Sequence, residues 1–374
     1  MRILEFLRLA RLRVRGAAWV SAWRVIRIGT LLRWALSPYR SPRASGGRGL
    51  VVYDFSSQPV SVGDLLLARV AAECLRLRAP GQRVDIAFIS ESAGIADAAA
   101  SIDEVGRVLQ AVRLDPELGN VFFFGDREEF ERFLSTLPPA TSIWPSPAYY
   151  VSGQYSYYLL WNELLYDCFH RYRTLPHLRS APRARAWAEG FVAGHAGART
   201  AVSVQLRRNL SNPARNSDFD AWIAFFDEYV RRGEPFVFFV VGSASEVDPR
   251  LAACPNVVLA KAFHTALDQD LALIDVCAAH MGAASGPSTM AFFSDKPYVL
   301  FGWRTTDHRY RDLHAQDNVR RFYFATPDQR LIADLETTDS IEAEFARIRH
   351  ALARAPAQGA AAETTVAVSE GAVQ

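Results

Sequence analysis

The sequence is poor in lysine and in cysteine, and both shortages limit what the chain can be. Only two of its 42 basic residues are lysines, Lys261 and Lys296, and 40 acidic residues nearly balance the basic ones. This balance argues against a nucleic-acid partner. The four cysteines are far apart and form no Cys-x-x-Cys pair, which argues against a disulfide framework or a zinc site and favours a reducing compartment.

Several functional motifs are also missing. The sequence contains no Gly-x-Gly-x-x-Gly or Walker loop, which argues against NAD or ATP, and no Gly-x-Ser-x-Gly elbow. Its eight histidines include no close pair with a third ligand nearby, so we expect no metal ion and no cofactor.

Long hydrophobic runs are absent from the N-terminal segment, residues 1–45, which is instead rich in arginine and tryptophan. Residues 1–40 hold nine arginines and a single acid, Glu5, and the longest uncharged run is far too short to span a bilayer. Arginine with tryptophan suits an anionic membrane surface, so residues 1–36 are a candidate for peripheral contact with the inner face of the cytoplasmic membrane. The other interpretations are a helix packed on the protein body and a lead-in with little structure.

After the Ser/Pro/Gly/Arg-rich linker at residues 40–49, apolar strands alternate with helices. Continuous apolar strands between helices predict parallel sheets that are covered on both faces. We therefore predict an α/β protein with two Rossmann-like domains, at residues 46–180 and 195–335, facing a cleft. A C-terminal helix at 336–354 is expected to pack across the domain junction, and residues 355–374 read as a disordered tail. The predicted strands are 49–55, 84–90, 121–124, 142–144, 200–206, 235–241, 257–259, 278–281 and 298–301, and the predicted helices are 61–78, 102–112, 127–137, 219–231, 267–277, 287–293 and 341–354.

The stretch Ser285-Gly286-Pro287-Ser288-Thr289 is the most informative motif. It follows a predicted strand and opens a predicted helix with proline and two hydroxyl residues in its first turn. Such a helix start leaves backbone N–H groups free to meet an anion. The alternative is an ordinary capped turn between a strand and a helix.

This motif continues as Ala291-Phe292, Lys296-Pro297 and Phe301-Gly302, and the whole pattern resembles the donor-side signature of GT-B glycosyltransferases. It is most similar to the heptosyltransferase-like and fucosyltransferase-like groups that build bacterial surface polysaccharides. The resemblance covers roughly residues 200 to 303, and it implies that Ser285–Thr289 holds the diphosphate or ribose of a nucleotide sugar. The Asp-x-Gly-x-x-His form of heptosyltransferases is missing, so the resemblance does not identify the sugar.

A second stretch places cations after the strand 200–206. Arg207 and Arg208 follow this strand directly, and Arg215 lies in the loop beyond, at the sheet edge where open α/β folds bind ligands. An arginine can hold a phosphate through two hydrogen bonds. By resemblance to fucosyltransferase-like enzymes, Arg207 neutralises the leaving diphosphate, with Arg208 or Arg215 as substitutes. The alternative is a solvated charged loop.

Two further positions complete the predicted donor site. Gly242 ends the apolar strand 235–241, where the missing side chain lets backbone approach a ligand. The resemblance places the nucleobase beside residues 260–263, and Lys261 in this stretch is a candidate phosphate contact. An exposed lysine is the alternative.

The N-terminal half offers one catalytic candidate, Asp64. The stretch Gly63-Asp64-Leu-Leu-Leu resembles the heptosyltransferase-type turn whose aspartate acts as base, and an inverting transferase needs one carboxylate to take the acceptor's proton. Aspartate near a helix start also caps helices, and the two roles are compatible. Ser61 before it, and Tyr149, Tyr150 and Tyr155 in an aromatic-rich stretch, are the predicted acceptor contacts.

The sequence therefore predicts a metal-independent, inverting glycosyltransferase that moves a sugar from a nucleotide diphosphate sugar to a polysaccharide or lipid-linked glycan. Two alternatives are enzymes, a sugar-nucleotide epimerase of the same fold and a polysaccharide pyruvyl transferase. A third is a non-catalytic scaffold in envelope polysaccharide assembly.

Overall fold

The computed structural model describes residues 48–55, 61–79, 81–89, 106, 110–112, 119–125, 127–138, 141–145, 157–208, 213, 216–303, 313–316 and 319–354. The basic segment 1–45, the tail 355–374 and most of the helix predicted at 102–112 lie outside these ranges.

The N-terminal unit is built on a four-stranded parallel sheet in the order β3-β2-β1-β4. Strands β1 and β2 are buried along their whole length because their apolar runs face helices on both sides. Strand β3 is an edge strand, and Phe123 on it is 39% exposed, so it is less buried than its apolar sequence predicts. The elements of this unit are β1 (Gly49–Asp54), α3 (Val62–Arg78), β2 (Val84–Ile89), β3 (Val121–Phe124), α5 (Arg127–Thr136), β4 (Ser142–Trp144) and α7 (Tyr157–Tyr172).

The C-terminal unit is built on an eight-stranded sheet in the order β10-β11-β12-β9-β8-β5-β6-β7. Six of its strands are parallel, and in chain order they follow the 3-2-1-4-5-6 arrangement of a Rossmann sheet. The hairpin β10–β11 extends one edge in antiparallel fashion. The strands are β5 (Thr200–Gln205), β6 (Phe236–Val241), β7 (Val257–Leu259), β8 (Ala279–Ala283), β9 (Tyr298–Phe301), β10 (Leu313–Gln316), β11 (Val319–Phe322) and β12 (Gln329–Ile332).

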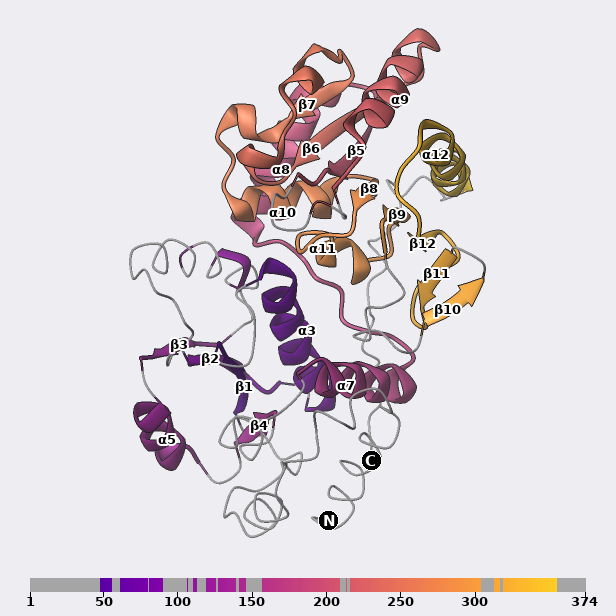
Figure 1. Ribbon diagram of the computed structural model, residues 1–374. Helices are drawn as coiled ribbons and strands as arrows, with labels where there is room; N and C mark the ends of the chain where they lie inside the picture. Colours follow the sequence, from indigo (N-terminus) through magenta and orange to yellow (C-terminus); the bar gives the residue numbers. More distant parts are fainter. Residues whose placement is uncertain are drawn as a thin grey trace, which may run out of the picture.

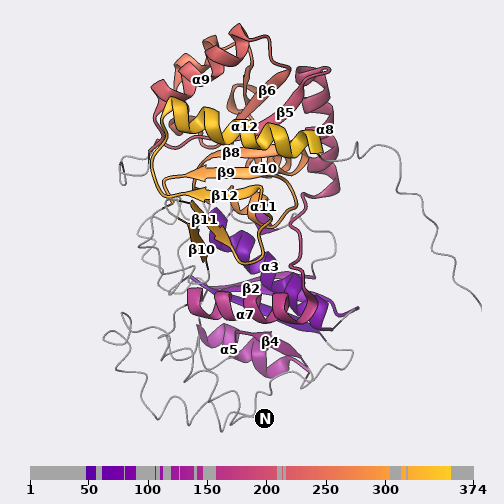
Figure 2. The same cartoon turned by 90° about the vertical axis from the view of Figure 1, so that its right-hand side faces the viewer.

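Helices cover both faces of the second sheet. On one face lie α8 (Pro182–Ala196), α10 (Leu267–Val276) and α11 (Thr289–Phe292), which share a core with the odd residues of β6. On the other face lie α9 (Phe219–Arg231) and α12 (Thr338–Arg354), whose buried side chains form a second core with Phe238 and Val299. In Figure 2, α12 runs nearly parallel to β8, β9 and β12, which appear below it in this view.

Helix α3 connects the two units. It is apolar around most of its circumference, and eleven of its residues are buried, as expected of a helix enclosed on all sides. In Figure 1 it stands between the two sheets, with α11 at its upper end and α7 beside its lower end. One continuous cluster of buried side chains therefore runs from the four-stranded sheet through α3 and α11 into the eight-stranded sheet.

The structure differs from the sequence-based expectations in several elements. Helix α8 and strands β10–β12 are not predicted, because the buried side of α8 is made of alanines (Ala184, Ala188 and Ala196) and these strands are short and carry charged residues. The helix predicted at 287–293 is a single turn. Helix α12 packs on α9 and β9 within the C-terminal unit, so the expectation that it crosses the junction is wrong.

The position of α12 predicts a large loss of stability on truncation of Phe345. This side chain is fully buried and its ring lies 5.0 Å from those of Tyr229 and Phe236. Phe345→Ala is expected to lower the free energy of unfolding by about 3 to 5 kcal/mol, because it leaves a cavity among aromatic rings. Chemical denaturation of this variant and of Arg347→Ala, an exposed position on the same helix, measures the difference. Equal stability of the two variants would contradict the packing.

Candidate functional site

The two units meet where the second sheet reverses its strand order. Strands β5 and β8 are neighbours, β6 lies beyond β5 and β9 beyond β8, so the chain leaves their carboxyl ends in opposite directions. In open parallel sheets, this crevice is where ligands bind. Gln205 is the last residue of β5 and is followed by Leu206 and Arg207. Residues Ala284 to Thr289 come directly after β8. The candidate site is therefore built at these two strand ends.

The first turn of α3 packs directly on the loop that follows β8. A Cβ atom added to Gly286 would lie 2.8 Å from the backbone nitrogen of Gly63, and one added to Gly63 would lie 3.1 Å from the Cα of Gly286. Only two glycines allow this approach. It brings Asp64, next in the chain to Gly63, beside the predicted donor-binding loop.

Asp64 is held in place by Ser61. The hydroxyl of Ser61 donates to Oδ2 of Asp64 at 2.6 Å and accepts a hydrogen bond from the Asp64 backbone N–H at 3.2 Å. Ser61 is thus the N-cap of α3, and the capping role considered for the aspartate belongs to the serine. The Asp64 side chain is 6% exposed, and its orientation is fixed at the contact between the units.

The loop Ser285–Thr289 is more enclosed than the sequence predicts. Ser288 is fully buried and Thr289 is 4% exposed. The backbone N–H groups of Thr289 and Met290 donate to the carbonyls of Gly286 and Pro287, so these amides are used inside the turn. The helix expected at 287–293 is therefore shortened to the four residues of α11, and two of the amides expected to be free are occupied.

A buried histidine that sequence reasoning missed ties this loop to the sheet. His280 on β8 places Nδ1 2.9 Å from Ser203 Oγ and Nε2 3.1 Å from Ser288 Oγ. The Ser203 hydroxyl is also within hydrogen-bond reach of the Ala279 carbonyl, and the Ser288 hydroxyl of the Ala283 carbonyl, so each ring nitrogen of His280 faces a hydroxyl that can donate or accept. Burial lowers the pKa of His280 to about 3, so the imidazole is neutral.

Arg207 lies at the edge of the site, between the ends of β5 and β6. Its backbone N–H donates to Ser217 Oγ at 3.2 Å, and its carbonyl accepts from the Ser217 N–H at 2.9 Å. Its Nε is enclosed and has no hydrogen-bond partner in the part of the chain that the structure describes. Burial raises the pKa of Glu246, and the charge of Arg207 opposes that rise, so the two side chains are within electrostatic reach.

The other two predicted cations already have partners. Arg208 donates to Asp248 Oδ2 at 2.7 Å and lies over the ring of Phe219. Lys261, in the 3-10 helix η4 (Ala260–Phe263), lies 2.7 Å from Asp270 Oδ2 and donates to the Thr265 carbonyl. Their charges are compensated by acids of the C-terminal unit, and a role in phosphate binding stays a prediction.

Gly242 and a second glycine enclose a side chain that the sequence did not single out. Gly242 has φ of 128° and Gly282 has φ of 127°, conformations that favour glycine. A Cβ on Gly242 would lie 2.5 Å from Nε2 of Gln205, and one on Gly282 would lie 2.0 Å from the Gln205 carbonyl oxygen. A close approach at Gly242 therefore exists, but the Gln205 side chain makes it, and the approach of a ligand at Gly242 stays a prediction.

Four predicted contacts lie outside the described residues, namely Arg215, Tyr149, Tyr150 and Tyr155. Their placement in the site stays a prediction.

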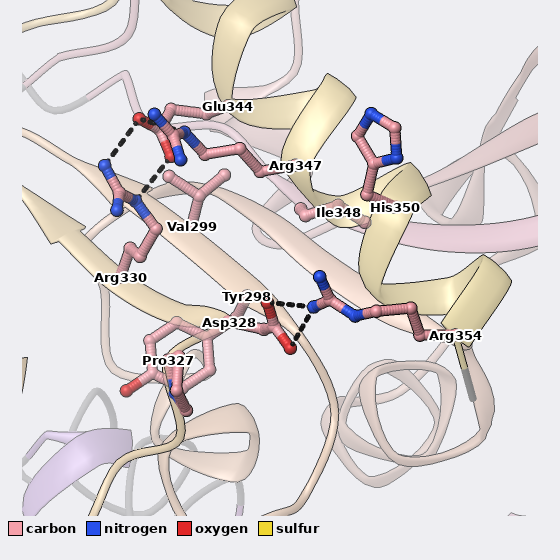
Figure 3. Close-up of a pocket in the computed structure, with 10 residues that line it drawn as sticks. All are labelled: Tyr298, Val299, Pro327, Asp328, Arg330, Glu344, Arg347, Ile348, His350 and Arg354. Atoms are coloured by element: carbon pink, nitrogen blue, oxygen red, sulfur yellow. Dashed lines mark hydrogen bonds and ion pairs between the residues drawn. The ribbon is translucent and has the colours of Figure 1, made fainter.

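A cavity of about 280 Å³ lies at the opposite end of the second sheet, under α12 (Figure 3). Tyr298 and Arg330, near the starts of β9 and β12, contribute to its lining. The arginines inside it are paired, Arg330 with Glu344 at 2.7 Å and Arg354 with Asp328 at 2.9 Å. Because parallel sheets bind ligands at the carboxyl ends of their strands, we do not assign the functional site to this cavity.

Within the described part of the chain, no group of three or more His, Cys, Asp or Glu side chains has the arrangement of a metal site. The chain has two Asp-x-Asp stretches, at 218–220 and 268–270. One carboxylate of each has a structural partner within the chain: Asp218 caps α9, and Asp270 pairs with Lys261. None of the described helices has the length and apolar character needed to cross a membrane.

The enclosed imidazole predicts a pH-dependent stability. Below about pH 6.5 the unfolded chain binds a proton that folded His280, with its pKa of about 3, does not. The free energy of unfolding therefore falls as pH drops from 6.5 towards 3, by up to about 1.4 kcal/mol per pH unit. In His280→Gln this contribution disappears and the slope is smaller. Urea denaturation between pH 6.5 and 3 measures this dependence of the free energy of unfolding on pH. The matched control is His350→Gln, at an exposed histidine on α12. If wild type and His280→Gln show the same slope against pH, the enclosed imidazole is not neutral.

Comparison with known proteins supports the fold independently of any one residue. No protein-family model and no curated protein sequence matches the chain. Among solved structures, a glycosyl transferase family 9 protein from Veillonella parvula DSM 2008 is similar, with 14% identity and a TM-score of 0.51 over 83% of this chain and 91% of that one. The E. coli ADP-heptose lps heptosyltransferase II is similar with 13% identity and a TM-score of 0.50 over 81% of this chain and 99% of that one. The chain therefore has the two-unit α/β fold of GT-B glycosyltransferases, as its donor-side motif predicts.

Proposed function

We propose that this protein is a glycosyltransferase that transfers a sugar from a nucleotide diphosphate sugar to a polysaccharide or lipid-linked glycan. The observation that carries the proposal is the contact between Gly63 and Gly286. It sets a carboxylate of one unit, Asp64, beside the ligand-binding strand ends of the other. A transferase with two substrates needs such an arrangement, because acceptor and donor have to meet with a base between them.

The donor is assigned to the C-terminal unit. Its six parallel strands follow the Rossmann order, and the crevice beside β5 and β8 is where such sheets bind nucleotides. The similar E. coli protein is described as an ADP-heptose heptosyltransferase, which supports a nucleotide sugar as donor without identifying the sugar for this chain.

Arg207 is proposed to stabilise the departing diphosphate. Its enclosed Nε has no hydrogen-bond partner within the described ranges, whereas Arg208 and Lys261 are already paired. A guanidinium can hold two phosphate oxygens at once, and in a site shielded from water it stabilises charge that develops as the sugar–phosphate bond breaks. The proposed reaction is metal-independent.

Asp64 is proposed to be the base. Its carboxylate would take the proton of the acceptor hydroxyl while that oxygen forms the new bond to the sugar and the nucleotide diphosphate leaves from the opposite face. A single displacement of this kind inverts the configuration at the sugar carbon. The hydrogen bond from Ser61 holds the carboxylate in one orientation.

The acceptor is proposed to be held by the N-terminal unit, at or near the cytoplasmic membrane. This part rests on the sequence: residues 1–36 combine arginine with tryptophan, and Tyr149, Tyr150 and Tyr155 offer rings and hydroxyls to a glycan.

Nucleotide binding is the first test. A thermal-shift panel of UDP, GDP, ADP and CMP is expected to give one or more nucleotides that raise the melting temperature by about 3 to 5 °C at a hundredfold excess over Kd. Arg207→Lys is expected to weaken that nucleotide's binding by about 10- to 100-fold, because lysine loses the second hydrogen bond to phosphate. The exposed Arg231→Met on α9 is the control. A scaffold would bind none of the four nucleotides, and the proposed function would then fall.

Catalysis is tested separately at Asp64. With the identified nucleotide sugar and an envelope glycan as acceptor, Asp64→Asn is expected to lower kcat by about 10²- to 10⁴-fold and to leave donor affinity nearly unchanged. Ser61→Ala is expected to have a smaller effect, because it loosens the carboxylate without removing it. Full activity of Asp64→Asn would rule the aspartate out as base. Turnover of the nucleotide sugar without any acceptor would identify an epimerase instead.

A further inference from the structure

Gln205 is a buried polar residue at the carboxyl end of β5 that the mechanism above does not use. Its side chain is 2% exposed. Its Nε2 donates to the carbonyl of Leu206 at 3.2 Å, whereas its Oε1 is enclosed and has no hydrogen-bond partner among the described residues. Buried carbonyl oxygens in proteins are nearly always hydrogen-bonded, so this atom requires an explanation.

The orientation of the carboxamide is fixed. If the side chain turned over, Oε1 would face the carbonyl oxygen of Leu206, and two acceptors would repel each other. The group left without a partner is therefore an acceptor, and it needs a donor. The nearby backbone N–H of Gly242 gives Oε1 no hydrogen bond either; it lies close enough to the carboxyl group of Asp270 to oppose the rise in that group's pKa that burial causes.

The surroundings of Gln205 are shaped around its side chain. It is paired with Val241 of β6 and with Gly282 of β8, so it lies at the centre of the reversal in strand order. Gly242 and Gly282 both have positive φ, and a methyl group on either would collide with Gln205. Any larger residue at these two positions would displace the carboxamide or the strand that carries it.

We propose that Oε1 of Gln205 accepts a hydrogen bond from a hydroxyl group of the bound nucleotide sugar. This inference rests on the proposed function. At neutral pH the diphosphate offers acceptors, which cannot satisfy a carbonyl oxygen, whereas the ribose and the transferred sugar both carry hydroxyl donors. Gln205 would then bind a hydroxyl group of the ligand. Arg207, two residues further along the same segment, would bind the charged diphosphate.

The experiment combines a change in the protein with a change in the ligand. Binding of the best nucleoside diphosphate, of its 2′-deoxy and 3′-deoxy analogues and of the matching nucleotide sugar is measured by calorimetry, for wild type and for Gln205→Met, which keeps the side chain's length and removes the acceptor. Wild type is expected to bind one deoxy analogue about tenfold more weakly than the parent nucleotide. Gln205→Met is expected to bind that deoxy analogue and the parent nucleotide with the same affinity, which is lower than the affinity of wild type for the parent.

The ligands separate the two sources of the hydroxyl. A loss in Gln205→Met that already appears with the nucleoside diphosphate assigns the contact to ribose. A loss that appears only with the nucleotide sugar assigns it to the transferred sugar. Gly242→Ala, whose methyl group would displace the carboxamide, is expected to remove the same discrimination and serves if Gln205→Met does not fold.

Two negative results have different meanings. If wild type binds the nucleotides and Gln205→Met binds every ligand as wild type does, the role of Gln205 is overturned and the proposed function stands. If wild type binds no nucleotide or nucleotide sugar, the proposed function fails and this inference fails with it.

Discussion

The two units meet backbone against backbone at Gly63 and Gly286. Without side chains at these positions, the first turn of α3 can approach the loop after β8 to within van der Waals distance. The placement of Asp64 depends on this approach, because the aspartate follows Gly63 in the same turn. So does the enclosure of α3, whose apolar sides join the cores of both sheets into one cluster. A methyl group at Gly286 would clash with the Gly63 backbone, and one at Gly63 would press on the Cα of Gly286, so either would move Asp64 relative to the loop Ser285–Thr289.

Around this contact, polar groups are fixed mainly by neighbours from distant parts of the sequence. The neutral imidazole of His280 links Ser203 on β5 to Ser288 in the loop. Lys296 donates to the carbonyls of Ile274, Asp275 and Cys277 and so closes the end of α10. These bonds leave little freedom in the loop after β8, and a rigid loop suits a site that must present fixed groups to a phosphate. Lys296 belongs to the donor-side motif, yet its contacts are structural ones.

Much of the fold follows from local patterns in the sequence, and the site follows only in part. Continuous apolar runs identify β1, β5 and β6, and the amphipathic pattern gives α9 with its observed bounds. Helix α8 cannot be predicted in this way, because the alanines on its buried face differ little in hydrophobicity from the residues on its exposed face. Asp64 and Arg207 are found through motifs, whereas His280 and Gln205 are single polar residues in apolar strands. Their roles depend on partners such as Ser203, 77 residues away from His280, which no local pattern reveals.

The only two lysines of the sequence, Lys261 and Lys296, both have partners within the protein. Lys261 is paired with Asp270, and Lys296 is bound to the end of α10, where burial lowers its pKa to about 8. An amine-directed acylating reagent reaches either Nζ only when the local structure opens, since each nitrogen is occupied by internal acceptors. The extent of acylation at each lysine, measured by mass spectrometry, therefore reports separately on the opening of η4 and of the α10 terminus. The arginine side chains on the surface do not react with the reagent.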